Sequence, residues 1–264
     1  MVKTRDNCNL DRLIIVKGNG PILITGPHSV ETIRHKPERE IHGAEANINC
    51  IINKLYKSLG PKLCTVMMWN KKYIEDNALY PSDPNFEYDL KKSLWYKQFK
   101  KLKITKPFFY LHLDLHGMLD TSTKNDIELG MKAIHLYRPG LSQHMKPIIR
   151  EAFKKMEETF SFHSHFQGWG GINKYTLSNQ GSLLGFYSIQ IELSTTTRSR
   201  FCKKKKSFNK FTKVIREIYK EWKKEMKKPK HKHKTIKHKR KKAKNKKKTR
   251  KNFYKNSYSN NFRR

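Results

Sequence analysis

Apolar residues recur with one of two periods over most of the chain. Some segments follow the two-residue period of strands, and others follow the 3.6-residue period of helices. Apolar runs typical of strands cover residues 13–16, 21–25, 62–69, 107–115, 131–137 and 186–193. Helical spacing covers residues 44–59, 86–103, 142–160 and 208–222. The first two runs are separated by only four residues, so they predict a hairpin or two closely spaced strands.

Punctuating residues support these boundaries. Gly60-Pro61 ends the first helical pattern, and Ser142 is a suitable N-cap for the third. Pro147 is expected near the first turn of that helix, where proline is tolerated. Alternating strands and helices predict an α/β fold, with three α/β/α layers around a mixed central sheet. We expect one such domain over residues 10–226.

Charge divides the chain into two parts. The formal net charge is +36, and residues 201–264 hold 29 lysines and arginines against three glutamates, a net charge of +26. From residue 227 onward the sequence is rich in Lys, His and Asn and nearly free of apolar residues. Such a composition cannot bury a core, so residues 227–264 are predicted to be a disordered basic tail.

The cysteines and the hydropathy restrict the class of protein further. Cys8, Cys50, Cys64 and Cys202 are far apart and form no C-x-x-C pair, which argues against a zinc ribbon and a disulfide framework. We therefore expect free thiols in a reducing compartment. Because no apolar run approaches a membrane span and the first residues are polar, we expect no membrane partner. The predicted location is intracellular, either cytoplasmic or nuclear through the basic tail.

Polar residues able to hold a metal follow the predicted strands. His28 and Glu31 form an H-x-x-E motif after one strand, and Asp114 and His116 end another. The carboxyl ends of parallel strands meet at one edge of a sheet, so His28, Glu31 and His116 could bind one zinc ion. Asp114 shares a strand face with His116 and could accept its second N–H. Glu192, inside an apolar strand, could move protons during hydrolysis.

Each of these residues also has a structural interpretation. A single H-x-x-E arises by chance, His116 could cap its strand, and Glu192 could lie at an exposed strand end. The metal hypothesis depends on their joint occurrence at strand ends.

The motifs and their order resemble the N-formylglutamate amidohydrolase family, which shares a phosphorylase/hydrolase-like fold with zinc carboxypeptidases. The matching residues are Pro27-His28-Ser29, Asp114-Leu115-His116-Gly117, Gly170-Gly171 with Tyr175-Thr176, and Gln190-Ile191-Glu192-Leu193-Ser194. The resemblance implies one Zn²⁺ held by His28, Glu31 and His116. It also implies catalysis by Glu192 and hydrolysis of a C–N bond in an amide or peptide.

The chain departs from the family pattern near the substrate. Phe86 follows Asp83-Pro84-Asn85 where many relatives have an arginine suited to a substrate carboxylate. Val30 and Gly117 also differ from the family residues, Gly and Ser respectively. Arg34, Arg138 and Lys174 are alternative cations, although each could be an ordinary surface charge. The residues assigned to substrate binding are Asn85, Arg138, Gly170 and Gly171.

Two functions from different classes remain open. The first is a zinc-dependent hydrolase acting on a small acyl-amino acid or peptide. The second is a nucleic-acid-binding protein that uses its polybasic tail and carries an inactive hydrolase-like domain. The tail could also be a solvated low-complexity extension. The oligomeric state, the substrate and the role of the tail do not follow from the sequence.

Overall fold

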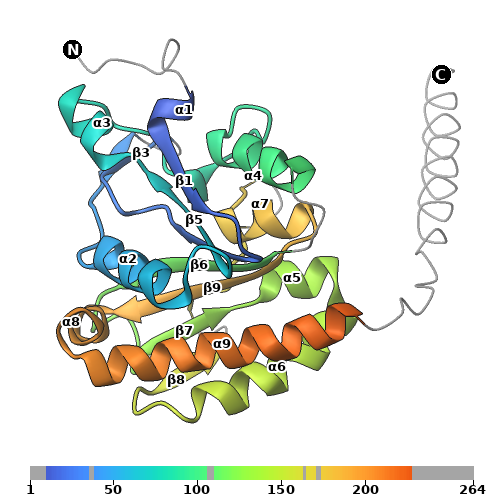
Figure 1. Cartoon of the computed structure of the whole chain (residues 1–264). Helices are drawn as coiled ribbons and strands as arrows, with labels where there is room; N and C mark the ends of the chain where they lie inside the picture. Colours follow the sequence, from blue (N-terminus) through green and yellow to red (C-terminus); the bar gives the residue numbers. More distant parts are fainter. Residues whose placement is uncertain (1–9, 36–38, 106–109, 163–164, 171–173, 228–264) are drawn as a thin grey trace, which may run out of the picture. The chain divides into compact units, whose positions relative to one another are not determined.

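A computed structural model describes residues 10–35, 39–105, 110–162, 165–170 and 174–227. The chain forms an α/β fold around a seven-stranded mixed sheet in the order β1-β5-β2-β6-β9-β7-β8 (Figure 1). These strands are β1 (Ile14–Gly18), β2 (Ile22–Gly26), β5 (Cys64–Trp69), β6 (Leu111–Met118), β7 (Ile127–Gly130), β8 (Phe160–Phe162) and β9 (Tyr187–Ser194). A separate hairpin pairs β3 (Thr32–Arg34) with β4 (Glu40–His42).

The helices fill the connections between strands. They are α1 (Leu10–Leu13), α2 (Ile48–Leu59), α3 (Lys71–Asp76), α4 (Leu94–Thr105), α5 (Lys132–Tyr137), α6 (Pro139–Phe153), α7 (Leu177–Leu183), α8 (Thr195–Lys203) and α9 (Lys205–Lys227). A short 3₁₀ turn, η1, covers Pro84–Phe86. Among the described residues, no helix combines the length and apolar character needed to cross a bilayer.

Three parallel strands form the centre of the sheet. β6 pairs in parallel with β2 on one side and with β9 on the other. Their carboxyl ends therefore lie together at one edge, where side chains that follow the three strands can meet. The antiparallel strands β1 and β7 lie farther out, against β5 and β9 respectively.

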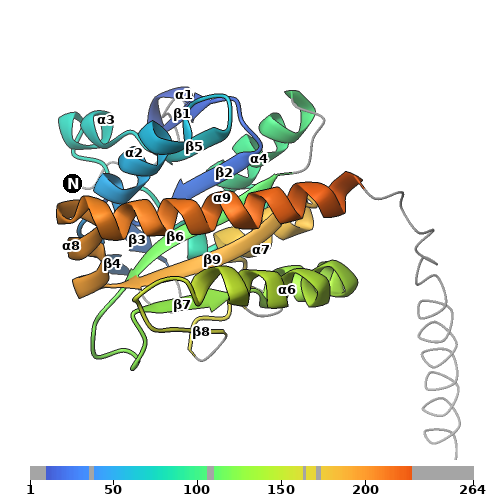
Figure 2. The ribbon, with the colours of Figure 1, turned by 60° about the horizontal axis from the view of Figure 1, so that its bottom comes forward.

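Helices cover both faces of the sheet (Figures 1 and 2). α2, α8 and α9 pack on one face, and α9 joins this layer through the stacked rings of Phe201 and Phe211. α4 and α7 lie on the other face, where Trp95 packs edge-on against Trp69 with ring centroids 5.2 Å apart. Burying these aromatic rings against the sheet is a main source of the stability of the fold.

Most predicted elements are present, with shifted ends. The helix predicted over 44–59 begins later, at Ile48, and the helix predicted over 86–103 begins at Leu94, after the 3₁₀ turn. Residues 13–16 and 21–25 do form strands, but not a hairpin with each other, because β5 lies between β1 and β2. β1 therefore pairs with β5, which is distant in the sequence, rather than with β2, its neighbour along the chain. The helix α7 was not predicted.

Two local predictions were wrong. The apolar run 131–137 is the helix α5, and the strand, β7, ends just before it at Gly130. A run this short fits either period, so its pattern alone could not separate strand from helix. α6 begins at Pro139 rather than after Ser142, which places Pro147 inside the helix. Pro139 occupies the first turn, where a proline needs no hydrogen-bonding N–H.

The expectation of free thiols was wrong for two of the four cysteines. Cys50 of α2 and Cys202 of α8 form a disulfide bond, with Cα atoms 6.1 Å apart. Their separation of 152 residues hid this pairing from the sequence. Cys64 is free and buried, and burial raises the pKa of its thiol to about 12. Cys8 and the predicted basic tail from residue 228 onward lie outside the described residues.

Candidate metal centre and active site

The carboxyl edge of the central strands brings together three of the residues that the sequence singled out. His28 lies in the turn after β2, while His116 and Glu192 lie near the ends of β6 and β9. His116 and Glu192 are direct neighbours in the register of the parallel pair. All three side chains are buried, and the rings of His28 and His116 lie 4.9 Å apart between centroids.

Glu45, which the sequence analysis did not select, lies at the centre of this cluster. Its Oε1 is 2.7 Å from His28 Nδ1, 3.7 Å from His42 Nε2 and 3.8 Å from His116 Nδ1. Its Oε2 accepts a hydrogen bond of 2.7 Å from the Gly117 backbone N–H. One carboxylate therefore joins the loop before α2 to the end of β6 and faces three imidazole rings.

The outer nitrogens of both core histidines face carboxylates. His28 Nε2 donates to Asp83 Oδ1 at 2.9 Å, and His116 Nε2 lies 3.3 Å from Asp114 Oδ2. Asp83 holds a proton on His28 Nε2 and leaves His28 Nδ1 directed at Glu45. Asp83 is itself held by Arg34, whose Nε donates to Asp83 Oδ2 at 2.8 Å. The two rings are thus oriented so that the same kind of nitrogen, Nδ1, faces the centre.

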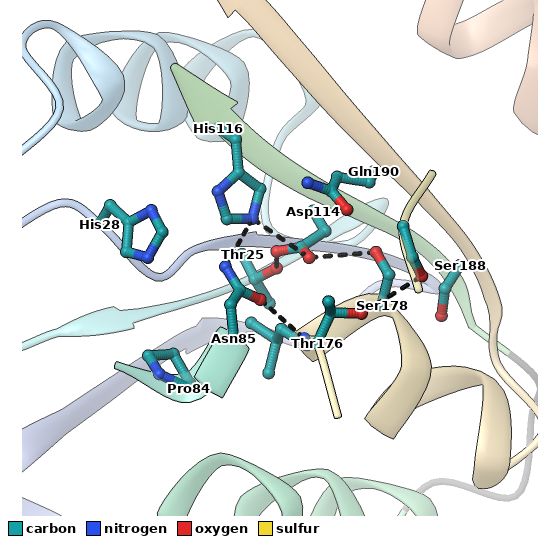
Figure 3. Close-up of polar contacts among 12 residues, drawn as sticks. Thr25, His28, Pro84, Asn85, Asp114, His116, Thr176, Ser178, Ser188 and Gln190 are labelled. Carbon is teal, nitrogen blue, oxygen red and sulfur yellow. Dashed lines mark hydrogen bonds and ion pairs between the residues drawn. The ribbon is translucent and has the colours of Figure 1, made fainter. Parts of the chain in front are cut away.

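A buried hydrogen-bond chain extends behind His116 (Figure 3). Thr25 Oγ1 donates to Asp114 Oδ1 at 2.7 Å, and Ser178 Oγ donates to Asp114 Oδ2 at 3.0 Å. Because the Thr25 proton goes to Asp114, Thr25 accepts from His112 Nε2 at 2.9 Å. Burial lowers the pKa of His112 to about 4, so its ring is neutral. His112 Nδ1 must then accept from Ser188 Oγ, 2.9 Å away.

This chain explains why the strand sequence Leu111–Gly117 carries three polar side chains in a fully buried position. His112, Asp114 and His116 occupy alternate positions, so they face the same side of β6. A Cβ atom at Gly181 would lie 2.7 Å from both His112 Nδ1 and Ser188 Oγ, so only glycine leaves room for this bond. The polar chain is therefore built into the packing of α7 against the sheet.

Burial and charge act against each other at the centre. Burial lowers the pKa of His28, but Glu45 and Asp83 outweigh it and raise the value to about 9. The pKa of His116 is likewise raised, since Asp114 and Glu192 oppose the effect of burial. Burial raises the pKa of Glu45, but the charge of His28 and the contacts with His116, His28 and His42 together outweigh burial and hold the pKa well below its usual range. Without a metal, the cluster is a set of imidazolium–carboxylate pairs.

Glu192 differs from the other carboxylates of the site. Its side chain is buried, and its Oε1 accepts a hydrogen bond from Gln190 Nε2. Burial raises its pKa to about 7, although the nearby His116 acts in the opposite direction. A carboxylate with a pKa near neutrality can both accept and return a proton at physiological pH.

Gly117 has a steric reason to lack a side chain. A Cβ atom at this position would lie 1.7 Å from Nη1 of Arg198, a buried residue of α8. Arg198 Nη2 donates to Thr195 Oγ1 and to the Met118 carbonyl. Burial lowers the Arg198 pKa, while Glu45 and Glu192 oppose that shift. The glycine in place of the serine expected from the family pattern thus makes room for a cation close to two site carboxylates.

The structure does not bring Glu31 into the cluster. Its side chain is exposed and lines a separate cavity of about 450 Å³ with Ser29, Val30 and residues of α3. Among the described residues, His28, His42 and Glu45 each offer a ligand atom within 4.8 Å of the other two, and neither Glu31 nor His116 belongs to this group. The chain contains a second H-x-x-E motif, His42-Gly43-Ala44-Glu45. The glutamate of this second motif, Glu45, lies in the cluster, whereas Glu31 of the first motif does not.

The residues assigned to substrate binding are distributed differently. Asn85 is in the site: its Oδ1 accepts from the Leu177 N–H at 2.8 Å, and its Nδ2 lies 3.3 Å from His116 Nε2. Arg138 lies at the junction of α5 and α6, and partial burial lowers its pKa. A Cβ atom at Gly170 would lie 2.5 Å from the Lys174 carbonyl oxygen, so the backbone there leaves no room for a side chain. Gly171 lies outside the described residues.

Two cations flank Phe86, the residue at the position of the family arginine. The Arg34 guanidinium lies 4.2 Å and the Lys174 ammonium 3.9 Å from the centroid of its ring. Arg34 is already paired with Asp83 and Glu40. Burial lowers the pKa of Lys174, and the neighbouring Arg34 adds to this effect. Positive charge therefore lies next to Phe86 although the residue itself is apolar.

No family model and no curated protein sequence matches the chain. Similar solved structures include an N-formylglutamate amidohydrolase from Ralstonia eutropha JMP134, with 12% identity over 80% of this chain and 98% of that chain and a TM-score of 0.45. A metallo-carboxypeptidase from Pseudomonas aeruginosa has 14% identity, covering 78% and 61%, and a TM-score of 0.46. A succinylglutamate desuccinylase/aspartoacylase from Rhodobacter sphaeroides has 18% identity, covering 79% and 58%, and a TM-score of 0.40.

These neighbours include the family that the sequence motifs resemble. With TM-scores below 0.5, however, they carry no argument about the activity of this chain.

The buried chain behind His116 can be tested with two substitutions of Thr25. Thr25→Val keeps the shape but leaves an Asp114 oxygen and a His112 N–H without a partner, at an expected cost of about 1–3 kcal/mol. Thr25→Ser keeps the hydroxyl and loses only a methyl group, at about 1 kcal/mol. Urea denaturation of both variants measures the difference. Equal losses would mean that Thr25 contributes by packing alone.

The metal-free protein should lose stability as the pH rises from 6.5 to 9. His28 has a folded-state pKa of about 9 against 6.5 for an unperturbed histidine, so its contribution is complete below 6.5 and is lost toward 9. His116 acts in the same direction, because its pKa is also raised. The His28 contribution is on the order of 3 kcal/mol. Denaturation at pH 6, 7.5 and 9 measures it, with His28→Asn as the control expected to show a weaker pH dependence. A stability that rises over this interval would contradict the assignment.

Proposed function

We propose that this protein is a zinc-dependent hydrolase that cleaves a C–N bond in a small acyl-amino acid or a peptide. In this proposal His28, Glu45 and His116 hold the metal, and Glu192 is the catalytic acid–base. Glu45 takes the place that the sequence resemblance implied for Glu31. One observation carries the proposal: two Nδ1 atoms, His28 and His116, face the same oxygen of Glu45 at 2.7 and 3.8 Å.

The donor set fits zinc. Imidazole nitrogens and a carboxylate oxygen are ordinary zinc ligands, and catalytic sites commonly use three protein ligands. The outer nitrogens of His28 and His116 meet Asp83 and Asp114, an arrangement that orients metal-binding histidines in proteins. The carboxylates also balance the charge of a buried cation. When bound, zinc would supply Lewis acidity that polarises the amide carbonyl and makes a water molecule more acidic.

Glu192 would supply the proton transfers. As a carboxylate it takes a proton from the attacking water while the new C–O bond forms at the amide carbon. It then gives this proton to the nitrogen as the C–N bond breaks, so that an acid and an amine leave the site. In the metal-free protein burial raises the pKa of Glu192 to about 7, so neither of its forms is strongly favoured there near neutral pH. Arg198 keeps positive charge near Glu192 and Glu45.

Lys174 is our candidate for binding a substrate carboxylate. It lies against the Phe86 ring, close to where the family arginine would be. Arg34 is less suitable, because Asp83 and Glu40 already pair with it. Among the described residues, no ion pair engages Lys174. Substrate tests should therefore compare acyl-amino acids and peptides that have a free carboxylate with their amidated forms.

Metal analysis provides the first test. Purified protein should contain about one zinc per chain, and His28→Ala and His116→Ala should lose it, because each removes a ligand. Glu45→Gln should weaken zinc binding strongly, whereas Glu31→Gln, which changes an exposed carboxylate, should leave it unchanged. Glu192→Gln should keep the zinc and lose turnover by at least a hundredfold.

Elemental analysis and a hydrolysis assay on a panel of amides measure these outcomes. Retained zinc in Glu45→Gln together with loss in Glu31→Gln would reverse the assignment of the carboxylate ligand. A folded wild-type protein that binds no zinc would remove the proposed function.

A second candidate function, contact with nucleic acid, is favoured by one feature of the described residues. The outward face of α9 carries a row of exposed cations, whereas its inner face is buried. The acidic residues of this helix are engaged: Glu217 pairs with Lys155, Glu221 with Lys224 and Glu225 with His144. The exposed cations of this row include Lys206, Lys213, Arg216, Lys220 and Lys223.

The composition of this face favours a phosphate backbone over a membrane. None of the large exposed hydrophobic residues of the described chain lies on α9, and membrane-surface helices need such residues for insertion. A stripe of lysines fits a regular row of phosphates. The role predicted for the tail from the sequence stays a prediction, because the tail lies outside the described residues.

Charge reversal on α9 tests this contact. Lys213→Glu/Lys220→Glu should weaken binding of a fluorescent 20-base-pair DNA duplex and lower the slope of log affinity against log salt by about 2. Lys91→Glu/Lys92→Glu, on an exposed turn elsewhere, has the same net charge and is the matched control. Both variants keep the basic tail, so its contribution cancels. Equal losses in the two variants, measured by anisotropy, would mean that only net charge matters.

A further inference from the structure

His42 has an unusual position beside the proposed metal ligands. It is the last residue of β4, in the two-stranded hairpin outside the main sheet. Its ring packs edge-on against the ring of His28, with centroids 4.2 Å apart. The imidazole therefore faces the cluster from the hairpin, whereas His28 and His116 reach the cluster from the ends of the central strands.

The inward nitrogen of His42 has no hydrogen bond. Its Nε2 is buried, and within the described part of the chain it makes no hydrogen bond. Glu45 Oε1 lies 3.7 Å from this nitrogen, beyond hydrogen-bond distance. Buried polar atoms are usually satisfied, and leaving one without a partner costs about 1–3 kcal/mol. An unsatisfied imidazole nitrogen aimed at a carboxylate points to a ligand that would complete it.

The distances in the cluster agree with the dimensions of a zinc site. Two atoms bound to one tetrahedral zinc ion lie about 3.3 Å apart, given Zn–N and Zn–O bonds near 2.0–2.1 Å. The distances from Glu45 Oε1 to the three imidazole nitrogens, 2.7, 3.7 and 3.8 Å, bracket this value. One ligand atom from each of His28, His42 and Glu45 lies within 4.8 Å of the other two.

We propose that His42 is a third imidazole ligand of the metal, so that the resting site has four protein ligands: His28, His42, Glu45 and His116. This inference rests on the proposed zinc function and extends it. In the sequence His42-Gly43-Ala44-Glu45, His42 ends β4 and Glu45 follows three residues later in the loop before α2. This short segment therefore brings an imidazole and a carboxylate to the same cluster.

Four protein ligands have a consequence for turnover. A tetrahedral zinc ion with four protein ligands has no open position, whereas hydrolysis needs one. His42 must then withdraw, or the coordination must expand to five, when the substrate is bound. Withdrawal is compatible with the fold, since β4 pairs with β3 alone and its movement leaves the seven-stranded sheet intact.

X-ray absorption at the zinc edge of the full-length protein, loaded with one equivalent of zinc, tests the proposal. The wild type should show three imidazole ligands, and His42→Ala and His42→Phe should each show two. Chelator competition should show at least a tenfold loss of zinc affinity in both variants, since even loss of an outer partner of a ligand costs 10–100-fold. His42→Phe keeps an aromatic ring packed on His28 and so separates packing from coordination.

His35→Ala is the matched control, because His35 follows β3, the partner strand of β4, and its Nε2 contacts Ser82 Oγ at 3.1 Å. It should keep three imidazoles and the wild-type affinity. Denaturation of the metal-free variants verifies that each one is folded.

The possible failures are distinct. Two imidazoles in the wild type, or wild-type affinity in His42→Phe, would overturn the role of His42 and leave the other three ligands in place. A wild type that binds no zinc would instead overturn the proposed function itself.

Discussion

The site depends on keeping one ionised carboxylate, Glu45, in a largely buried position. Burying such a charge is unfavourable unless it is paired and hydrogen-bonded. Glu45 meets this condition through His28 Nδ1 on one oxygen and the Gly117 N–H on the other. Because those partners come from the ends of β2 and β6, the charge balance of the site and the order of the sheet are linked. A change that removed either histidine would leave a buried carboxylate with fewer partners.

The same logic extends outward in layers. His28 needs Asp83, Asp83 needs Arg34, and each bond satisfies a group that would otherwise be costly to bury. Behind His116 the hydrogen-bond chain runs from Asp114 through Thr25 and His112 to Ser188, whose hydroxyl donates to His112 Nδ1. Such networks are stabilising only when every member is satisfied. This explains why the alternating polar residues His112, Asp114 and His116 can lie inside the buried strand β6.

The sequence predicted the central strands, and with them the meeting of His28, His116 and Glu192 at one edge, because strand period and strand ends are local properties. It predicted the wrong glutamate for the cluster. The chain contains two H-x-x-E motifs, at His28 and at His42, and both satisfy the same spacing rule. The family resemblance favoured the first. Only the path of the β3–β4 hairpin, which returns the chain to His28, identifies Glu45, and that path depends on tertiary contacts.

Two other errors also come from contacts between segments distant in the sequence. The β5 strand between β1 and β2 and the disulfide between Cys50 and Cys202 join segments distant in the sequence. The helix over residues 132–137 was missed because a short apolar run fits either period. Gly117 could be explained only after Arg198 was seen to occupy the space next to it.

The Cys50–Cys202 bond bears on how the molecule opens. α2 follows the loop that carries Glu45, and α8 follows the strand that carries Glu192, so the bond ties together the supports of the two carboxylates. Proteins open locally in units that are weakly held. With α2 and α8 covalently joined, this face of the sheet cannot separate as such a unit while the bond is intact. Among the described residues, no disulfide ties the β3–β4 hairpin, the other wall of the site, to the rest of the fold in this way.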